Sequence, residues 1–146
     1  MDLKELYQDI ILEHGKNPRN FGRCSGYSHK AKGHNPLCGD ELEITLTLSD
    51  EIIQDCRTIV RGCSICQASA SIMSDMIIKK TIKEAIKTSR MFDESLKKDD
   101  ENVPKTVEPL RPFLTLKKHR SRIKCMKLVW DALEECTNND KSTNHT

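Results

Sequence analysis

Residues 61–71 read Arg-Gly-Cys-Ser-Ile-Cys-Gln-Ala-Ser-Ala-Ser, and this stretch decides how the chain folds. The β-branched apolar run over 52–60 ends before Gly62, and small and apolar residues with helical spacing begin at Ser64. Cys63 therefore lies at a predicted strand-to-helix corner. Backbone N–H groups at a helix start lack intrahelical partners, and the helix dipole adds positive potential there. Both effects favour a thiolate, so we expect Cys63 to bind a metal or attack sulfur.

The residues before this corner predict a β-hairpin. Residues 41–48 alternate between apolar and polar side chains, which is typical of a half-buried strand. A turn over 49–51 separates this strand from a second one over 52–61, so the two are expected to pair antiparallel. Upstream, residues 14–37 are rich in Gly, Asn, Pro, Ser and Lys and predict an irregular connection with a short edge strand over 28–32.

Helices are predicted on both sides of the hairpin. Apolar residues with a helical period indicate helices over 2–13, 64–79 and 121–136. Thr81 and Glu84 have the spacing of a capping box, which starts another helix that runs to about residue 97. The charged segment 97–106 predicts a loop, and 107–116 is long enough for a short helix. The elements fit a single domain over residues 1–137, with a disordered polar tail over 138–146.

Composition limits the possible classes of function. The chain has 146 residues, of which 32% are charged and 36% hydrophobic, and its net charge of +2 is too small to indicate a nucleic-acid-binding protein. There is no apolar run of transmembrane length, and the charged N-terminus is unlike a signal peptide. We therefore expect a cytoplasmic protein that acts on neither nucleic acid nor membrane. A basic cluster over 117–124 is either a solvated helix flank or a partner-binding patch.

Seven cysteines in a reducing compartment indicate metal or sulfur chemistry before disulfides. Cys38 lies in a predicted turn, with Asp40 two residues later on the same side of the chain; Cys63 is at the corner, and Cys125 is expected in the first turn of the last helix. Three thiolates and one carboxylate form a tetrahedral set suited to zinc. Their four negative charges with Zn²⁺ leave a net −2, which needs compensation when buried. Nearby basic residues that could provide it are Arg61, Arg122 and Lys124.

Spacing alone leaves other interpretations open. Cys63 and Cys66 form a C-x-x-C pair after a strand, as in a redox dithiol, although no βαβ pattern precedes it. Cys56 and Cys136 are expected to be small buried hydrophobic residues, and Cys24 has no assigned role.

Four stretches together resemble the U-type iron–sulfur cluster assembly proteins (IscU, SufU and the N-terminal module of NifU). They are Glu-His-Gly-Lys-Asn-Pro-Arg-Asn at 13–20, Asn-Pro-Leu-Cys-Gly-Asp at 35–40, Gly-Cys-Ser-Ile at 62–65 with Ala-Ser-Ala-Ser at 68–71, and Arg-Ile-Lys-Cys at 122–125. The resemblance implies an α+β fold, in which a small antiparallel β-sheet packs against several α-helices. It also implies Cys38, Asp40, Cys63 and Cys125 as ligands of zinc, iron or a [2Fe–2S] cluster.

Details of the sequence are more similar to the SufU type than to scaffold-type IscU. Lys124 stands where IscU proteins place a histidine, their Leu-Pro-Pro-Val-Lys segment is absent, and residues 89–116 resemble the SufU insertion. The resemblance implies a zinc-dependent acceptor of persulfide sulfur from a PLP-dependent cysteine desulfurase. Cys38 would be the acceptor, Cys63 and Cys125 would hold metal or relay sulfur, and a downstream scaffold or apo-protein would receive it. The alternatives are a scaffold for [2Fe–2S] assembly and a structural zinc module for protein binding.

Overall fold

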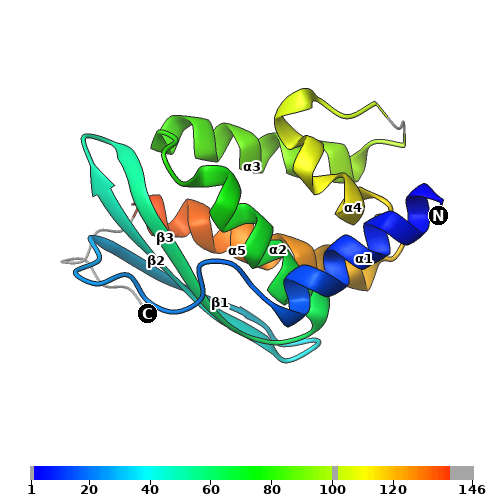
Figure 1. The fold of residues 1–146 in the computed structure, drawn as a ribbon, viewed down its shortest axis with the longest axis horizontal. Helices are drawn as coiled ribbons and strands as arrows, with labels where there is room; N and C mark the ends of the chain where they lie inside the picture. The colour runs from blue at the N-terminus through cyan, green and yellow to red at the C-terminus, as the bar shows by residue number, and fades with distance from the viewer. Residues whose placement is uncertain (1, 100–101, 139–146) are drawn as a thin grey trace.

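The computed structural model describes residues 2–99 and 102–138, and it has an α+β architecture (Figure 1). Three strands form one antiparallel sheet in the order β1-β2-β3. Their bounds are β1 His29–Asn35, β2 Asp40–Ser49 and β3 Ile52–Arg61. The helical elements are α1 Leu3–Lys16, α2 Ser64–Ile77, α3 Ile82–Lys97, the 3₁₀ turn η1 Lys105–Leu110, α4 Arg111–Leu114 and α5 Arg120–Asn138.

The register of the sheet fixes which end carries the site. Asn35 pairs with Asp40 across the β1–β2 turn, and Glu41 pairs with Arg61. The start of β2, the end of β3 and the β1–β2 turn therefore share one end of the sheet. The β2–β3 turn lies at the other end, where its Glu51 carbonyl accepts a hydrogen bond from the Ile82 N–H of α3.

The helices cover one face of the sheet, and the core lies between the two layers (Figure 1). Alternate residues of β2 and β3 point into this core, among them Ile44, Leu46 and Ile53, which are fully buried. Trp130 of α5 and Phe92 of α3 pack with ring centroids 5.9 Å apart. The small residues of α2 permit a close approach to α5. At the contact, Ser69 Oγ donates a hydrogen bond to the Met126 carbonyl at 2.6 Å.

Most of the predicted elements are confirmed. The capping box at Thr81 is formed as expected, since its hydroxyl accepts from the Glu84 N–H and the Glu84 carboxylate accepts from the Thr81 N–H. The edge strand is longer than predicted, because pairing with β2 extends it to Asn35. The segment 107–116 contains most of η1 and all of α4.

Two local expectations are corrected. Of the apolar face expected along α1, only Ile11 is buried, while Leu3 remains 60% exposed, because the N-terminal end of the helix extends beyond the neighbouring elements (Figure 1). Cys125 lies in the second turn of α5, because the helix starts at Arg120. The helix continues through Asn138, the first residue of the predicted tail; residues 139–146 lie outside the described residues, so the tail stays a prediction. Within the described chain, no helix has the length and apolar character needed to cross a bilayer.

Candidate metal centre

Cys38 is presented by the tight turn between β1 and β2. Asn35 Oδ1 accepts a hydrogen bond from the Leu37 N–H at 3.1 Å, and the backbone carbonyl of Asn35 accepts one from the Gly39 N–H at 2.9 Å. Gly39 has φ +76°, a conformation that glycine adopts without steric cost. The turn leaves Cys38 exposed to solvent.

Asp40 begins β2 and is 2% exposed, so its carboxylate needs hydrogen-bond partners. The Cys63 N–H, at the N-terminus of α2, donates to Asp40 Oδ1 at 3.0 Å. Cys38 Sγ donates to Oδ2 at 3.0 Å. Gly62 permits this arrangement, because a Cβ on that residue would collide with the Asp40 carboxylate.

Cys125 completes the group from the buried side of α5. Its Sγ lies 3.8 Å from Cys38 Sγ, although 87 residues separate the two in sequence. One donor atom from each of Cys38, Asp40 and Cys125 lies within 4.8 Å of the other two. Cys63 lies outside this mutual set, but its Sγ is 3.8 Å from Asp40 Oδ2. All four predicted ligands thus meet at one end of the sheet.

The separation of the Cys38 and Cys125 thiols fits two ligands of one tetrahedral metal ion. Zn–S bonds of about 2.3 Å place two thiolate ligands about 3.8 Å apart. The Sγ atoms of Cys38 and Cys125 are already separated by 3.8 Å. Three sulfur donors with one oxygen donor are compatible with zinc, and a thiolate-rich set is equally compatible with an iron–sulfur cluster.

Hydrogen bonds to Asp40 favour the ionised form of its carboxylate. Burial raises the pKa of Asp40, but hydrogen bonds from the Cys38 thiol and the Cys63 N–H outweigh burial and leave the pKa below its ordinary value. Burial, followed by the hydrogen bond with Asp40, raises the pKa of Cys125. Without a cation, a buried carboxylate therefore opposes ionisation of the neighbouring thiol, and a bound cation would relieve that opposition.

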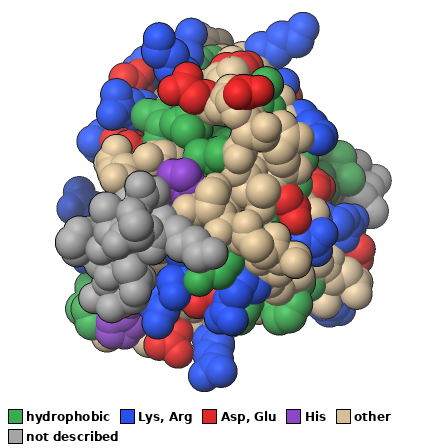
Figure 2. Space-filling model, turned by 90° about the vertical axis from the view of Figure 1, so that its left-hand side faces the viewer, with side chains coloured by type: hydrophobic (Ala, Val, Ile, Leu, Met, Phe, Trp, Pro, Cys, Tyr) green, Lys and Arg blue, Asp and Glu red, His purple; other side chains and the backbone are tan. Residues whose placement is uncertain are grey.

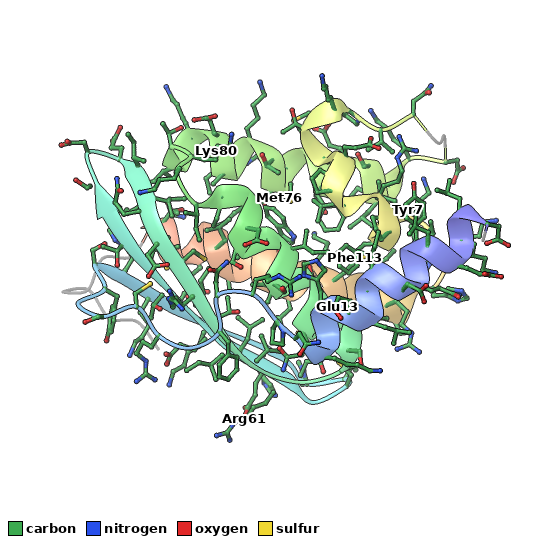
Figure 3. All side chains as sticks on the ribbon, viewed as in Figure 1. Tyr7, Glu13, Arg61, Met76, Lys80 and Phe113 are labelled. Carbon is green, nitrogen blue, oxygen red and sulfur yellow. The ribbon has the colours of Figure 1, made fainter. Side chains whose placement is uncertain are left out.

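The basic residues predicted to balance the site do not contact it directly. Arg61, Arg122 and Lys124 are exposed, and within the described residues none of their side chains makes an ion pair with Asp40. Figure 3 shows Arg61 extending away from the body of the protein. Their role in charge compensation stays a prediction, and the contacts that do reach Asp40 come from an N–H group and thiols.

The other cysteines lie in the core. Cys66 is fully buried one turn after Cys63, and burial raises its pKa to about 12. A thiol with so high a pKa is a poor nucleophile, which disfavours the redox dithiol. Cys56 and Cys136 are fully buried, as expected for small hydrophobic residues. Cys24 is also buried, and its N–H donates to Thr45 Oγ1 at 2.9 Å, so it anchors its loop to β2.

Two positioning residues had no predicted role. Asn35 shapes the turn that carries Cys38, and Gly62 makes room for Asp40. An Asn before a Pro-containing turn is a known turn-former, so Asn35 could have been assigned from sequence. The contact between Gly62 and Asp40 depends on strand register, which sequence alone leaves undetermined.

Comparison with known proteins gives consistent matches. The family model "NifU-like N terminal domain" matches residues 6–109. The zinc-dependent sulfurtransferase SufU of Bacillus subtilis is 34% identical over 134 residues, covering 92% of this chain and 90% of SufU. The iron–sulfur cluster assembly scaffold protein IscU of Streptococcus pyogenes serotype M1 is 29% identical over 143 residues, covering 98% of this chain and 89% of that protein.

A solved structure shows the same fold. A protein of Fervidobacterium islandicum AW-1, described as an iron–sulfur cluster assembly scaffold for the SUF system, superposes with a TM-score of 0.81 at 28% identity. The match covers 92% of this chain and 98% of that one. With the family model matching most of the chain and SufU matching nearly its full length, the chain belongs to the NifU-like N-terminal domain family, which includes IscU and SufU.

Proposed function

We propose that this iron–sulfur cluster assembly protein is a zinc-dependent acceptor of persulfide sulfur from a PLP-dependent cysteine desulfurase. The observation that carries the proposal is the difference in solvent exposure between the members of the cluster. Cys38 is exposed on its turn, whereas Asp40 and Cys125 behind it are buried. One thiol of the cluster is therefore accessible to a partner, while the others can retain a metal. The relative named as a zinc-dependent sulfurtransferase supports this chemistry.

Cys38, Asp40, Cys63 and Cys125 would hold the zinc ion. Zinc bound there would keep thiols deprotonated at neutral pH. Asp40 would be fixed for this role by the Cys63 N–H, since that hydrogen bond orients its carboxylate from the corner of α2. Gly39, which follows Cys38 in the turn, has no side chain that could cover the thiol.

Sulfur transfer would follow the chemistry of thiol–disulfide exchange. The Cys38 thiolate attacks the terminal sulfur of the enzyme persulfide, a new S–S bond forms on Cys38 Sγ, and the old S–S bond breaks. The desulfurase cysteine leaves as a thiolate, so charge and electrons balance without an external oxidant. The product is a Cys38 persulfide, ready for a downstream scaffold or apo-protein.

The test is a desulfurase assay with metal analysis of each variant. Addition of the wild-type protein should increase desulfurase turnover, and Cys38→Ala should abolish the increase. Ser25→Ala, an exposed loop substitution, is the matched control and should behave as wild type. If Cys38→Ala stimulates as well as wild type, the acceptor role is wrong.

The second candidate is a scaffold on which a [2Fe–2S] cluster is assembled. The relative named IscU and the thiol-rich donor set favour it. Anaerobic reconstitution followed by transfer to an apo-ferredoxin separates the two functions, because a sulfur carrier would deliver no intact cluster. Loss of folding on zinc removal, without any sulfur transfer, would instead indicate a structural zinc module.

A further inference from the structure

Beside the cysteine cluster lies a long segment without acidic residues. Although the chain has 24 basic and 22 acidic residues, none of residues 109–130 is Asp or Glu. The segment holds seven cations: Arg111, Lys117, Lys118, Arg120, Arg122, Lys124 and Lys127. Arg111 and Lys127 pair with acidic residues of neighbouring segments. Four others are exposed and make no ion pair with any described acidic residue; we call Lys118, Arg120, Arg122 and Lys124 the basic rim.

The basic rim lies at the N-terminal end of a helix, where positive charge lowers the stability of the fold. Three of its members lie in the first two turns of α5, which has no acidic residue in its first turn. The helix dipole makes cations unfavourable at this end, and neighbouring like charges repel. Folding alone would favour Asp or Glu here, so the rim is more simply explained by an interaction than by stability.

The basic rim adjoins the exposed thiol. Cys125 lies in the same two turns of α5 and its Sγ is 3.8 Å from that of Cys38, so the helix start and the β1–β2 turn lie side by side. The same turn carries Leu37, which is 77% exposed. By contrast, Figure 2 shows acidic and basic side chains interspersed on the opposite end of the molecule.

We propose that the basic rim and Leu37 form the docking surface for an acidic surface of the protein that delivers sulfur to Cys38. This inference rests on the proposed function and names the surface chemistry of its partner. Opposite charge around a small apolar contact would steer the partner and align its persulfide with Cys38. An acidic surface is complementary to the unpaired cations, and one with a central apolar pocket would also accommodate Leu37.

The test is the double charge reversal Lys118→Glu/Arg120→Glu in the full-length, zinc-loaded protein. These positions avoid the predicted ligands and the residues predicted to balance their charge. The matched control is Lys80→Glu/Lys83→Glu, which reverses two exposed lysines at the start of α3. Those lysines lie at the other end of the sheet, where the Lys80 carbonyl accepts from the Ile53 N–H. Both variants place acidic residues at a helix N-terminus, so neither thermal midpoint should fall.

Binding of purified cysteine desulfurase from the source organism is measured directly, alongside stimulation of its turnover. We expect Lys118→Glu/Arg120→Glu to weaken binding about tenfold at low salt, and the difference to shrink to about twofold in about 0.5 M NaCl, where screening is strong. The control should bind as wild type with unchanged zinc content. Equal binding by all three proteins would overturn the docking surface.

The outcomes separate this inference from the proposed function. If wild type binds but never stimulates turnover, the sulfur-acceptor role fails while the docking surface stands. If wild type stimulates and the reversed variant has the same affinity and salt dependence, the docking surface alone fails. Binding of duplex DNA is measured as a third comparison. If wild type binds DNA more tightly than the desulfurase, and Lys118→Glu/Arg120→Glu abolishes DNA binding, the basic rim binds nucleic acid and our proposal is wrong.

Discussion

Replacing Gly62 by Ala should disable the metal site without disturbing the core. A Cβ at this position would overlap Asp40 Oδ1 and lie 2.9 Å from the carboxylate carbon, a separation that real Cβ atoms essentially never show. Gly62 does not have a positive φ, so alanine fits the backbone itself. Asp40 therefore has to withdraw, and its hydrogen bond from the Cys63 N–H is lost.

The size of the effect follows from that bond. Breaking a buried hydrogen bond to a charged group costs about 1.5–3 kcal/mol. Alanine regains about 0.4–1 kcal/mol by restricting the unfolded chain. The metal-free protein should thus lose roughly 1–2 kcal/mol of unfolding free energy, and displacement of an oriented ligand should weaken zinc binding about 10- to 100-fold.

Urea unfolding of the metal-free protein and zinc competition against a chelator measure the two quantities. Gly33→Ala is the control, because its Cβ would meet only apolar side chains, Leu128 at 3.2 Å and Leu42 at 3.5 Å. That change should cost less than about 1 kcal/mol and leave zinc affinity unaltered. If Gly62→Ala binds zinc as tightly as wild type, the absence of a Cβ at residue 62 does not determine where the Asp40 carboxylate lies. Our account of the site geometry would then be wrong.

Two further predictions concern residues outside the ligand set. The hydrogen bond from Lys127 holds the pKa of Asp93 below its ordinary value of 3.8. Asp93 therefore stabilises the fold above that pH, and the contribution disappears as the pH falls through its folded pKa. Asp93→Asn should cost about 1 kcal/mol or less at neutral pH and nothing in strong acid, measured by urea unfolding across the acid range; a pH-independent cost would contradict this. Cys66→Ala should lower the free energy of unfolding by about 1 kcal/mol and leave zinc content and sulfur acceptance unchanged. Loss of sulfur acceptance in the folded variant would instead support the interpretation of Cys63 and Cys66 as a redox dithiol.

The sequence by itself determined the elements and the kinds of ligand. Alternation in 41–48 and the capping box at Thr81 act between near neighbours, so both appear in the structure where local chemistry predicts them. Likewise, Cys63 at the corner follows from where one periodicity ends and another begins. Local patterns failed where burial depends on distant segments, as for Leu3, which stays 60% exposed although Ile11 of the same helix is buried.

Only the tertiary structure brought Cys38 and Cys125 to 3.8 Å, because their meeting depends on α5 packing across β1 and β2. The same packing decided which thiol is accessible: Cys38 is exposed, while Cys66, so near Cys63 in sequence, is sealed in the core. Residue spacing names the candidate donors. Long-range packing and strand register decide which of these donors come together, which carboxylate lies between them, and which thiol is exposed.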